Sequence, residues 1–319
     1  MEKSLLLVLG ANPAWQKTLV FKDFIPGKVN RGVKEENYPS GKGVNFCRAA
    51  RCSKLADTCI FQFAGGINGQ RLCSGLESSG FMHHTINTSA ETRNCITCLT
   101  PDGKMTEIIG VSYPVSSEES FQMLQKIERT IAELPSNLSA TFAITGSLPD
   151  GSDPVLYEQA ARIASARNIP ILLDTLVKIP EILALPGKIV LKVNQEEFLK
   201  ITGCKDIISA HRFAIKMFPE KIFAITNGKD SATLSVRNEF YEYTLPEINV
   251  VSPLGAGDTA SAVLSALIAV NTDEADAFKM ALAAASANCL TPVAGEFSMA
   301  AAMEISARIK VAKTTLQEI

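Results

Sequence analysis

The sequence predicts an α/β fold: a doubly wound, mainly parallel sheet with helices on both faces, plus a small β-sheet that forms a lid. From about residue 140 onward, short β-rich runs alternate with helical patterns, which is typical of a parallel sheet covered by helices. The segments 12–37 and 91–110 alternate without helical periodicity and contain turns such as Pro101-Asp102-Gly103. They indicate an antiparallel excursion from the main sheet, the lid. No linker, charge block or repeat divides the chain, so we expect a single domain over residues 1–319.

The individual elements follow in chain order. The apolar run before Gly10 predicts a buried first strand and not a signal peptide, because no small-residue cleavage site follows it. A helix is expected to open within residues 40–55, and the later strands and helices are expected at TFAIT (141–145) with a helix from about Pro154, ILLD (171–174) with a short helix, KIVLKV (188–193) with NQEEFLKITG (194–203), KIFAIT (221–226) and the helix TASAVLSALIAV (259–270).

Charge and hydropathy narrow the class of protein. The chain has 31 basic and 33 acidic side chains and a formal net charge of −2, so it has no electrostatic footprint for nucleic acid or an anionic membrane. No window reaches the roughly 18 apolar residues of a spanning helix. We therefore expect a cytoplasmic protein without a membrane or nucleic-acid partner.

Cysteine and histidine give little support for a metal or redox site. Among the eight cysteines, Cys95-x-x-Cys98 is the closest pair, and it lacks a second pair or a histidine cluster nearby. A half-buried strand is the better interpretation. His83 and His84 are likewise expected at strand or surface positions.

Two glycines and an aspartate stand at a helix start in VSPLGAGDTASAVLSAL (251–267). A helix start presents unpaired N–H groups and a positive dipole end, and glycine lets a ligand approach that backbone closely. Asp258 could simply complement the helix dipole. Beside a bound anion, however, a carboxylate repels unless it has chemistry to do, such as accepting a proton from a hydroxyl nucleophile.

Two further clusters could provide partners for this corner. SGKGVN (40–45) lacks the spacing of a Walker A loop and of a dinucleotide fingerprint, but Lys42, Asn45 and the backbone of Gly41 could bind a polyol. NQEE (194–197) follows the strand KIVLKV directly, at the carboxyl end where open α/β sheets bind ligands. A helix start with a solvated charged face is the alternative interpretation of NQEE.

Seven short motifs are more specific in their joint order than any one alone. They are NPAWQKT (12–18), SGKGVN (40–45), ETR (91–93), GSLPDG (146–151), KVNQEE (192–197), TNGKDS (226–231) and PLGAGDT (253–259). In this order they resemble the PfkB/ribokinase family of carbohydrate kinases, most closely its 1-phosphofructokinase and tagatose-6-phosphate kinase branch. The resemblance implies a ribokinase-like fold with a β lid, the cofactors ATP and Mg²⁺, and phosphoryl transfer to a sugar hydroxyl.

The resemblance also implies roles for single residues. Asp258 matches the catalytic base, and the amides of Gly255, Ala256 and Gly257 match the anion hole. Asn194 and Glu197 match the element that organises Mg²⁺ through water, and the remaining nucleotide-side positions are Lys192, Thr226, Gly228, Ser252 and Ser286. The sugar-side positions are Asn12, Gln16, Gly41, Lys42, Asn45 and Arg93, with Lys28 and Arg31 reaching from the lid. Arg93 could clamp a substrate phosphate, or it could equally be solvated.

Three positions depart from the pattern of this branch. Gln16 stands where an aspartate usually grips sugar hydroxyls, Ser40 replaces the first glycine of Gly-Gly-Lys-Gly, and Ser231 replaces a glycine of the nucleotide loop. The kinase chemistry carries over, but the identity of the sugar does not.

We therefore expect an ATP-dependent kinase that phosphorylates a sugar phosphate such as fructose 1-phosphate or a tagatose or fructose 6-phosphate. The cations Lys28, Arg31, Lys42 and Arg93 favour an anionic substrate over the alternatives, an unphosphorylated sugar or a nucleoside. A degenerate kinase that senses a sugar or nucleotide is the alternative from another class. Because an antiparallel excursion cannot bury both of its faces alone, we expect a homodimer through the lid.

Overall fold

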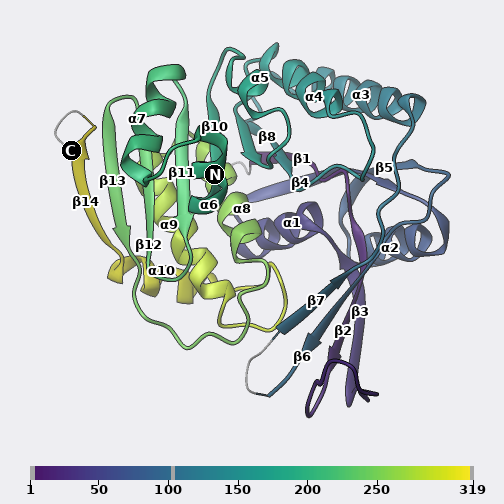
Figure 1. The fold of residues 1–319 in the computed structure, drawn as a ribbon. Coiled ribbons are helices and arrows are strands. Elements are labelled where there is room, and N and C mark those ends of the chain that lie inside the picture. Colours follow the sequence, from purple (N-terminus) through teal and green to yellow (C-terminus); the bar gives the residue numbers. More distant parts are fainter. Residues whose placement is uncertain (1–3, 102–104, 317–319) are drawn as a thin grey trace.

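The computed structural model describes residues 4–101 and 105–316, and it confirms the predicted fold class (Figure 1). A ten-stranded sheet has the order β14-β13-β12-β11-β10-β9-β8-β1-β4-β5. The seven strands from β11 to β5 are parallel to one another, while β12, β13 and β14 are added antiparallel at one edge. The strands of this sheet are β1 (Ser4–Leu9), β4 (Ala56–Ala64), β5 (Met82–Asn87), β8 (Ala140–Thr145), β9 (Ile171–Asp174), β10 (Ile189–Asn194), β11 (Ile222–Asn227), β12 (Ser231–Val236), β13 (Glu239–Thr244) and β14 (Lys310–Thr315).

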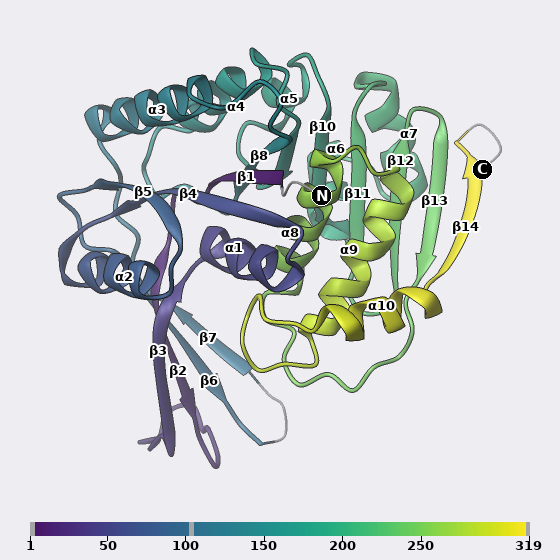
Figure 2. The same cartoon turned by 180° about the vertical axis from the view of Figure 1, so that it is seen from behind.

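Helices cover both faces of the large sheet. The helices are α1 (Lys42–Ser53), α2 (Gly66–Ser78), α3 (Ser117–Ala132), α4 (Val155–Ser165), α5 (Ile179–Leu183), α6 (Gln195–Thr202), α7 (Ile207–Met217), α8 (Ala256–Ala269), α9 (Glu274–Asn288) and α10 (Met299–Arg308). Side chains of β1 alternate between two cores because successive residues of a strand point to opposite faces. Leu6 and Val8 pack with α1, α2, α8, α9 and α10, whereas Leu7 and Leu9 pack with α3 to α7. Seen from behind, α9 lies in front of β11 and β12 (Figure 2).

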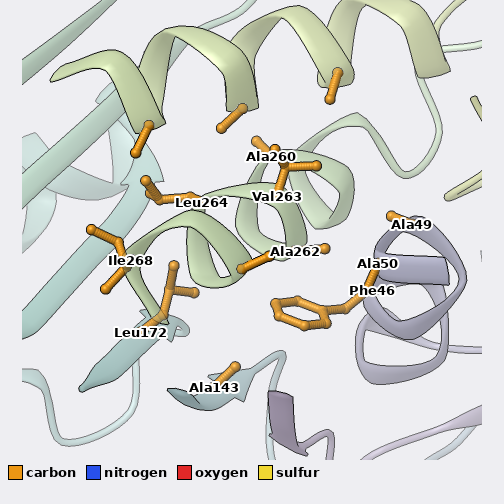
Figure 3. Packing of buried hydrophobic residues seen from close by; sticks show 14 of the residues in the cluster. Phe46, Ala49, Ala50, Ala143, Leu172, Ala260, Ala262, Val263, Leu264 and Ile268 are labelled. Carbon is orange, nitrogen blue, oxygen red and sulfur yellow. The ribbon is translucent and has the colours of Figure 1, made fainter. Parts of the chain in front are cut away.

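The core that contains Leu6 and Val8 also joins helices α1 and α8, which begin at the predicted motifs SGKGVN and PLGAGDT. The ring of Phe46 on α1 points toward Ala262 of α8, above Ala143 and Leu172 of the sheet (Figure 3). All four residues are at most 1% exposed. Small residues on α8 let the two helices and the sheet approach closely, so the starts of α1 and α8 are held on a rigid base.

The small sheet has the order β3-β2-β6-β7, with β2 (Ala14–Val20), β3 (Lys34–Ser40), β6 (Asn94–Leu99) and β7 (Met105–Ile109). It projects from the large sheet below α1 and α2 (Figure 1). The prediction of an extra β layer from 12–37 and 91–110 is confirmed, although β3 extends to Ser40. The turn expected at 101–103 lies partly outside the described residues.

The prediction that this layer is antiparallel throughout was wrong in one respect. The outer pairs β2–β3 and β6–β7 are antiparallel, but the central pair β2–β6 is parallel, with Trp15 opposite Asn94. Each excursion folds back on itself, and the two then join side by side.

The element predictions hold closely elsewhere. TFAIT, ILLD, KIVLKV and KIFAIT form β8 to β11, and Cys95 and Cys98 lie buried in strand β6. Within the described residues, no helix is long and apolar enough to cross a membrane.

Candidate active site

The candidate site lies at the carboxyl edge of the large sheet, where the strand order reverses. From β1 the chain adds β4 and β5 on one side and later β8 to β11 on the other, so a crevice is expected at the ends of β1 and β8. Helix α1 starts directly beside β1 because Gly10 and Gly43 touch: a Cβ on Gly43 would stand 2.8 Å from the Cα of Gly10. The second glycine of GKG is therefore required by packing. Gly41, at φ +103°, abuts the Cα of Pro13 in the same way.

The start of α8 has the geometry of an anion cradle. Gly255 adopts φ +79°, and a Cβ there would stand 2.7 Å from the Cβ of Ala294, so other residues are excluded. The first-turn amides have no carbonyl one helical turn earlier within the helix. The amide of Ala256 donates to the carbonyl of Pro253 at 3.3 Å, while Gly257 is exposed. The amides of Gly255 and Gly257 are therefore better candidates for binding an anion than that of Ala256.

Asp258 lies one residue further along this turn, buried to 7% exposure. Its Oδ2 accepts a hydrogen bond from Nδ2 of Asn45 on α1 at 2.9 Å. Burial, followed by the negative charge of Asp174, raises the pKa of Asp258 to about 6, against the opposing effect of Lys42. An ordinary first-turn acid on a solvated helix would keep the low pKa of an exposed carboxyl. The environment of Asp258 is that of a carboxylate poised to take up a proton near neutral pH.

Asp174 at the end of β9 is a site residue that the sequence patterns did not single out. Its carboxylate is bonded by Lys42 Nζ at 3.0 Å, by Lys192 Nζ at 3.0 Å and by the hydroxyl of Ser261 at 2.6 Å. Burial alone would raise the pKa of Asp174, but the two lysines hold it well below its usual range. Asp174 in turn raises the pKa of Lys42. One carboxylate therefore fixes two cations beside Asp258.

Lys192 contributes a second contact to this arrangement. Its ammonium group also donates to the carbonyl of Gly257 at 3.1 Å, and a Cβ on Gly257 would stand only 3.2 Å from it. The glycine therefore lets a buried cation reach the first turn of α8. The predicted residues Lys42, Asn45, Lys192, Gly257 and Asp258 are thus brought together.

Asn194 and Glu197 form a reciprocal capping box at the start of α6. Asn194 Oδ1 accepts from the amide of Glu197 at 2.8 Å, and Glu197 Oε2 accepts from the amide of Asn194 at 3.0 Å. This cap explains the spacing by helix structure alone. Each side chain still has hydrogen-bonding capacity, and the charge of Glu197 reaches Lys42. Carboxylate and amide oxygens fit a hard cation held through water.

The predicted nucleotide-side residues are spread over the neighbouring elements. Thr226 is the penultimate residue of β11, and Gly228 adopts φ +60° in the β11–β12 turn. Ser231 begins β12, and its hydroxyl accepts from Asn227 at 3.2 Å. A cavity of about 530 Å³ adjoins this turn, and its lining includes Lys229, Asp230, Leu245, Val250 and Arg308.

Ser252 precedes α8 and Ser286 lies in α9, and both are buried. The Ser252 hydroxyl accepts from the amide of Leu254 at 3.3 Å, and the Ser286 hydroxyl donates to the carbonyl of Leu282 within α9 at 3.0 Å. Both hydroxyls thus have protein partners.

On the sugar side, Asn12 and Arg93 lie together. Asn12 Nδ2 donates to the hydroxyl of Ser147 and the carbonyl of Leu148, both at 3.3 Å. Arg93 donates to the carbonyl of Asn12 at 2.9 Å and to that of Pro13 at 3.4 Å. Part of the Arg93 guanidinium group is therefore bonded to backbone carbonyls. This counts against the prediction that Arg93 clamps a substrate phosphate.

Gln16 is buried to 4% exposure in β2, and its Nε2 donates to Thr97 Oγ1 of β6 at 2.9 Å. Lys28 and Arg31 are exposed in the connection between β2 and β3, at the end of the small sheet remote from the large one (Figure 1). Within one chain, these two cations are not brought to Asp258.

Comparison with known proteins agrees with this geometry. Residues 11–300 match the family described as pfkB family carbohydrate kinase. Among solved structures, phosphofructokinase-2 of Escherichia coli in complex with potassium is 21% identical, with a TM-score of 0.84 over 96% of this chain and 99% of that chain. A possible 1-phosphofructokinase of Thermotoga maritima is 18% identical, with a TM-score of 0.83 over 97% and 99%. These structural likenesses show the fold, and the family match spans most of the chain. The chain belongs to the pfkB family of carbohydrate kinases.

Proposed function

We propose that this carbohydrate kinase uses ATP and transfers the γ-phosphoryl group to a hydroxyl of a sugar phosphate. The observation that carries the proposal is Asp258: a buried carboxylate with a pKa of about 6 in the first turn of a glycine-opened helix, beside two lysines.

In the proposed reaction, Asp258 accepts the proton of the attacking hydroxyl. Asn45 already bonds Oδ2, so Oδ1 is the oxygen that takes the proton. The hydroxyl oxygen bonds to the γ-phosphorus as the bond from that phosphorus to the β–γ bridging oxygen breaks, and ADP leaves with the electron pair. The amides of Gly255 and Gly257 and the ammonium groups of Lys42 and Lys192 stabilise the charge on the migrating group.

Asn194 and Glu197 are the residues that would hold Mg²⁺, through water. When bound, that ion neutralises charge on the nucleotide phosphates. The adenine end of the nucleotide is proposed to lie toward Thr226 and Gly228, next to the cavity lined by Lys229 and Asp230.

A second candidate acceptor is an unphosphorylated sugar. It is favoured by the backbone hydrogen bonds of Arg93, which occupy part of the group predicted to bind a substrate phosphate. These bonds do not use all of the donors of Arg93, since a guanidinium carries five N–H groups.

The test is release of ADP from ATP by the purified protein, with a panel of sugar phosphates and the matching free sugars. We expect a sugar phosphate to stimulate ADP release and to gain one phosphate, and the Asp258→Asn protein to serve as the control. Stimulation by free sugars alone would favour the second candidate. No stimulation by any member of the panel would contradict the proposed reaction.

We also propose that the chain forms a homodimer through the small sheet. The sheet carries the exposed apolar side chains Ile108 and Ile109 on β7 and Val29 in the β2–β3 connection. A second copy could cover them and bring Lys28 and Arg31 to a site. Sedimentation at micromolar concentration is expected to give the mass of a dimer, and a monomer alone would contradict this.

A further inference from the structure

We propose that Arg48 is a positioning residue for Asp258 and that it acts through the side-chain amide of Asn45. The inference rests on the proposed role of Asp258 as the proton acceptor, and it assigns a task to a residue that the predicted motifs did not include.

The guanidinium group of Arg48 is fixed by three oxygen atoms from three parts of the chain. Nη1 donates to Asn45 Oδ1 at 3.0 Å and to the carbonyl of Ala294 at 2.8 Å, and Nη2 donates to the carbonyl of Pro39 at 2.8 Å. The ring of Tyr38 lies 5.6 Å from the guanidinium carbon. Arg48 is thus tied to strand β3 and to the loop after α9 as well as to its own helix.

This arrangement determines which way the Asn45 amide points. An arginine has donors only, so the atom of Asn45 that faces it must be the oxygen. The hydroxyl of Ser40 also donates to that oxygen, at 3.3 Å. The Asn45 nitrogen is therefore turned toward Asp258, where it donates to Oδ2 at 2.9 Å. Asn45 is 6% exposed, so little water is present to hold the amide in this orientation if Arg48 is lost.

The orientation matters for the carboxylate in two ways. A donor on Oδ2 favours the ionised form of Asp258, which is the form that accepts a proton. It also restricts rotation of the carboxylate and occupies Oδ2, which leaves Oδ1 for the hydroxyl in the proposed reaction. If the amide flipped, its oxygen would face the carboxylate oxygen, and the two acceptors would repel.

Other charged groups surround the pair and bear on the interpretation. Asp258 is faced by Asp174 from β9, by Lys42 from α1 and by Lys192 from β10. Arg48 is faced by Tyr38 from β3, Glu296 from the loop after α9, and Cys47 and Cys52 from its own helix. The test must therefore separate an effect of the Arg48 charge from an effect transmitted by Asn45.

Three substitutions make this separation. Arg48→Gln removes charge and fork, and Arg48→Lys keeps the charge but cannot bond all three oxygens in the same geometry. Arg51→Gln is the matched control. Arg51 lies on the same helix, donates to the carbonyl of Ser79 at 2.6 Å and stacks on Phe81.

The measurement is the pH profile of kcat/KM for phosphoryl transfer. We expect the acid limb of both Arg48 variants to move to higher pH by about one unit, the effect of one hydrogen bond to a charged group. The loss of kcat/KM should approach about tenfold well below pH 6, shrink between pH 6 and pH 8, and be almost absent above pH 8. Arg51→Gln should keep the wild-type profile. An Asn45→Ala protein should already show the shift, and adding Arg48→Gln should shift it no further.

A second readout does not depend on turnover. The ¹³C signal of the Asp258 carboxyl, assigned by its loss in Asp258→Asn, should titrate at higher pH in both Arg48 variants. If this signal shifts while no kinase activity is found, the proposed function fails and the positioning role stands. Two results would overturn the inference. One is that Asp258 titrates at the same pH in Arg48→Lys as in the wild type. The other is that Arg48→Gln shifts this titration equally in the presence of Asn45 and in the Asn45→Ala protein.

Discussion

Replacing Asp258 by asparagine is expected to abolish most of the turnover and at the same time to stabilise the fold. Asparagine has nearly the same shape and can still accept the hydrogen bond from Asn45 Nδ2. It cannot accept the proton of a hydroxyl. Removing a general base lowers turnover by about two to four decades. Nucleotide affinity should change little, because the first-turn amides and the lysines stay in place.

The gain in stability follows from the raised pKa. A carboxyl pKa of about 6 in place of 3.8 means that the ionised form is about 3 kcal/mol less favourable in the folded chain than in the unfolded chain. Between these two pH values the folded state binds more protons than the unfolded state, so the wild type loses stability as the pH rises. The advantage of asparagine should therefore be complete above pH 6 and absent below about pH 4.

Two measurements check this prediction together. Thermal unfolding at pH 8 and pH 4 should show a midpoint several degrees higher for Asp258→Asn at pH 8 only. Steady-state kinetics on the accepted sugar should show the loss of turnover. Near-normal turnover would mean that Asp258 only complements the helix dipole. An unchanged unfolding midpoint at pH 8 would mean that the ionised carboxylate of Asp258 does not destabilise the folded state.

Further predictions concern other groups of the site. The kcat/KM of the wild type should fall about tenfold per pH unit below about pH 6, as Asp258 becomes protonated; a profile flat to pH 5 would contradict this. Asp174→Asn leaves Lys192 buried without its carboxylate, so urea unfolding should show a loss of about 3–5 kcal/mol, and an unchanged midpoint would refute the pairing. Gln16→Asp should raise kcat/KM on fructose 1-phosphate and tagatose 6-phosphate by a factor that corresponds to about 1–2 kcal/mol of transition-state stabilisation. Efficient use of these sugars by the wild type, or a further loss in the variant, would show that Gln16 does not mark a changed substrate.

Local patterns predicted β1 and β8 to β11 because each of these strands is a mainly apolar run. They did not predict β5, whose sequence MHHTIN is not apolar. They could not predict that β2 pairs parallel to β6, since each excursion alone has the alternation of a hairpin. Asp174 was missed for a related reason. Its only signal is an acid at the end of ILLD, and its meaning depends on Lys42 and Lys192, which only the fold brings to it.

The position of Arg48 was likewise invisible in sequence. A basic residue one turn after GKGVN looks like a solvated charge, yet it contacts carbonyls of Pro39 and Ala294 that are remote along the chain. In contrast, the glycine and aspartate of PLGAGDT could be predicted, because a helix start and its first-turn acid are local features.

The parallel pairing of β2 with β6 also has a consequence for the order in which the chain folds. Trp15 pairs with Asn94, and β3, α1, β4, α2 and β5 lie between them in the chain. Closing so long a loop is entropically unfavourable until those elements are packed. The pairs β2–β3 and β6–β7 can form early. They can join only after β4 and β5, with helices α1 and α2, have packed onto the large sheet. We therefore expect the small sheet to assemble last and to open first, so that the part of the molecule expected from the sequence to form a lid is also the part that unfolds most easily.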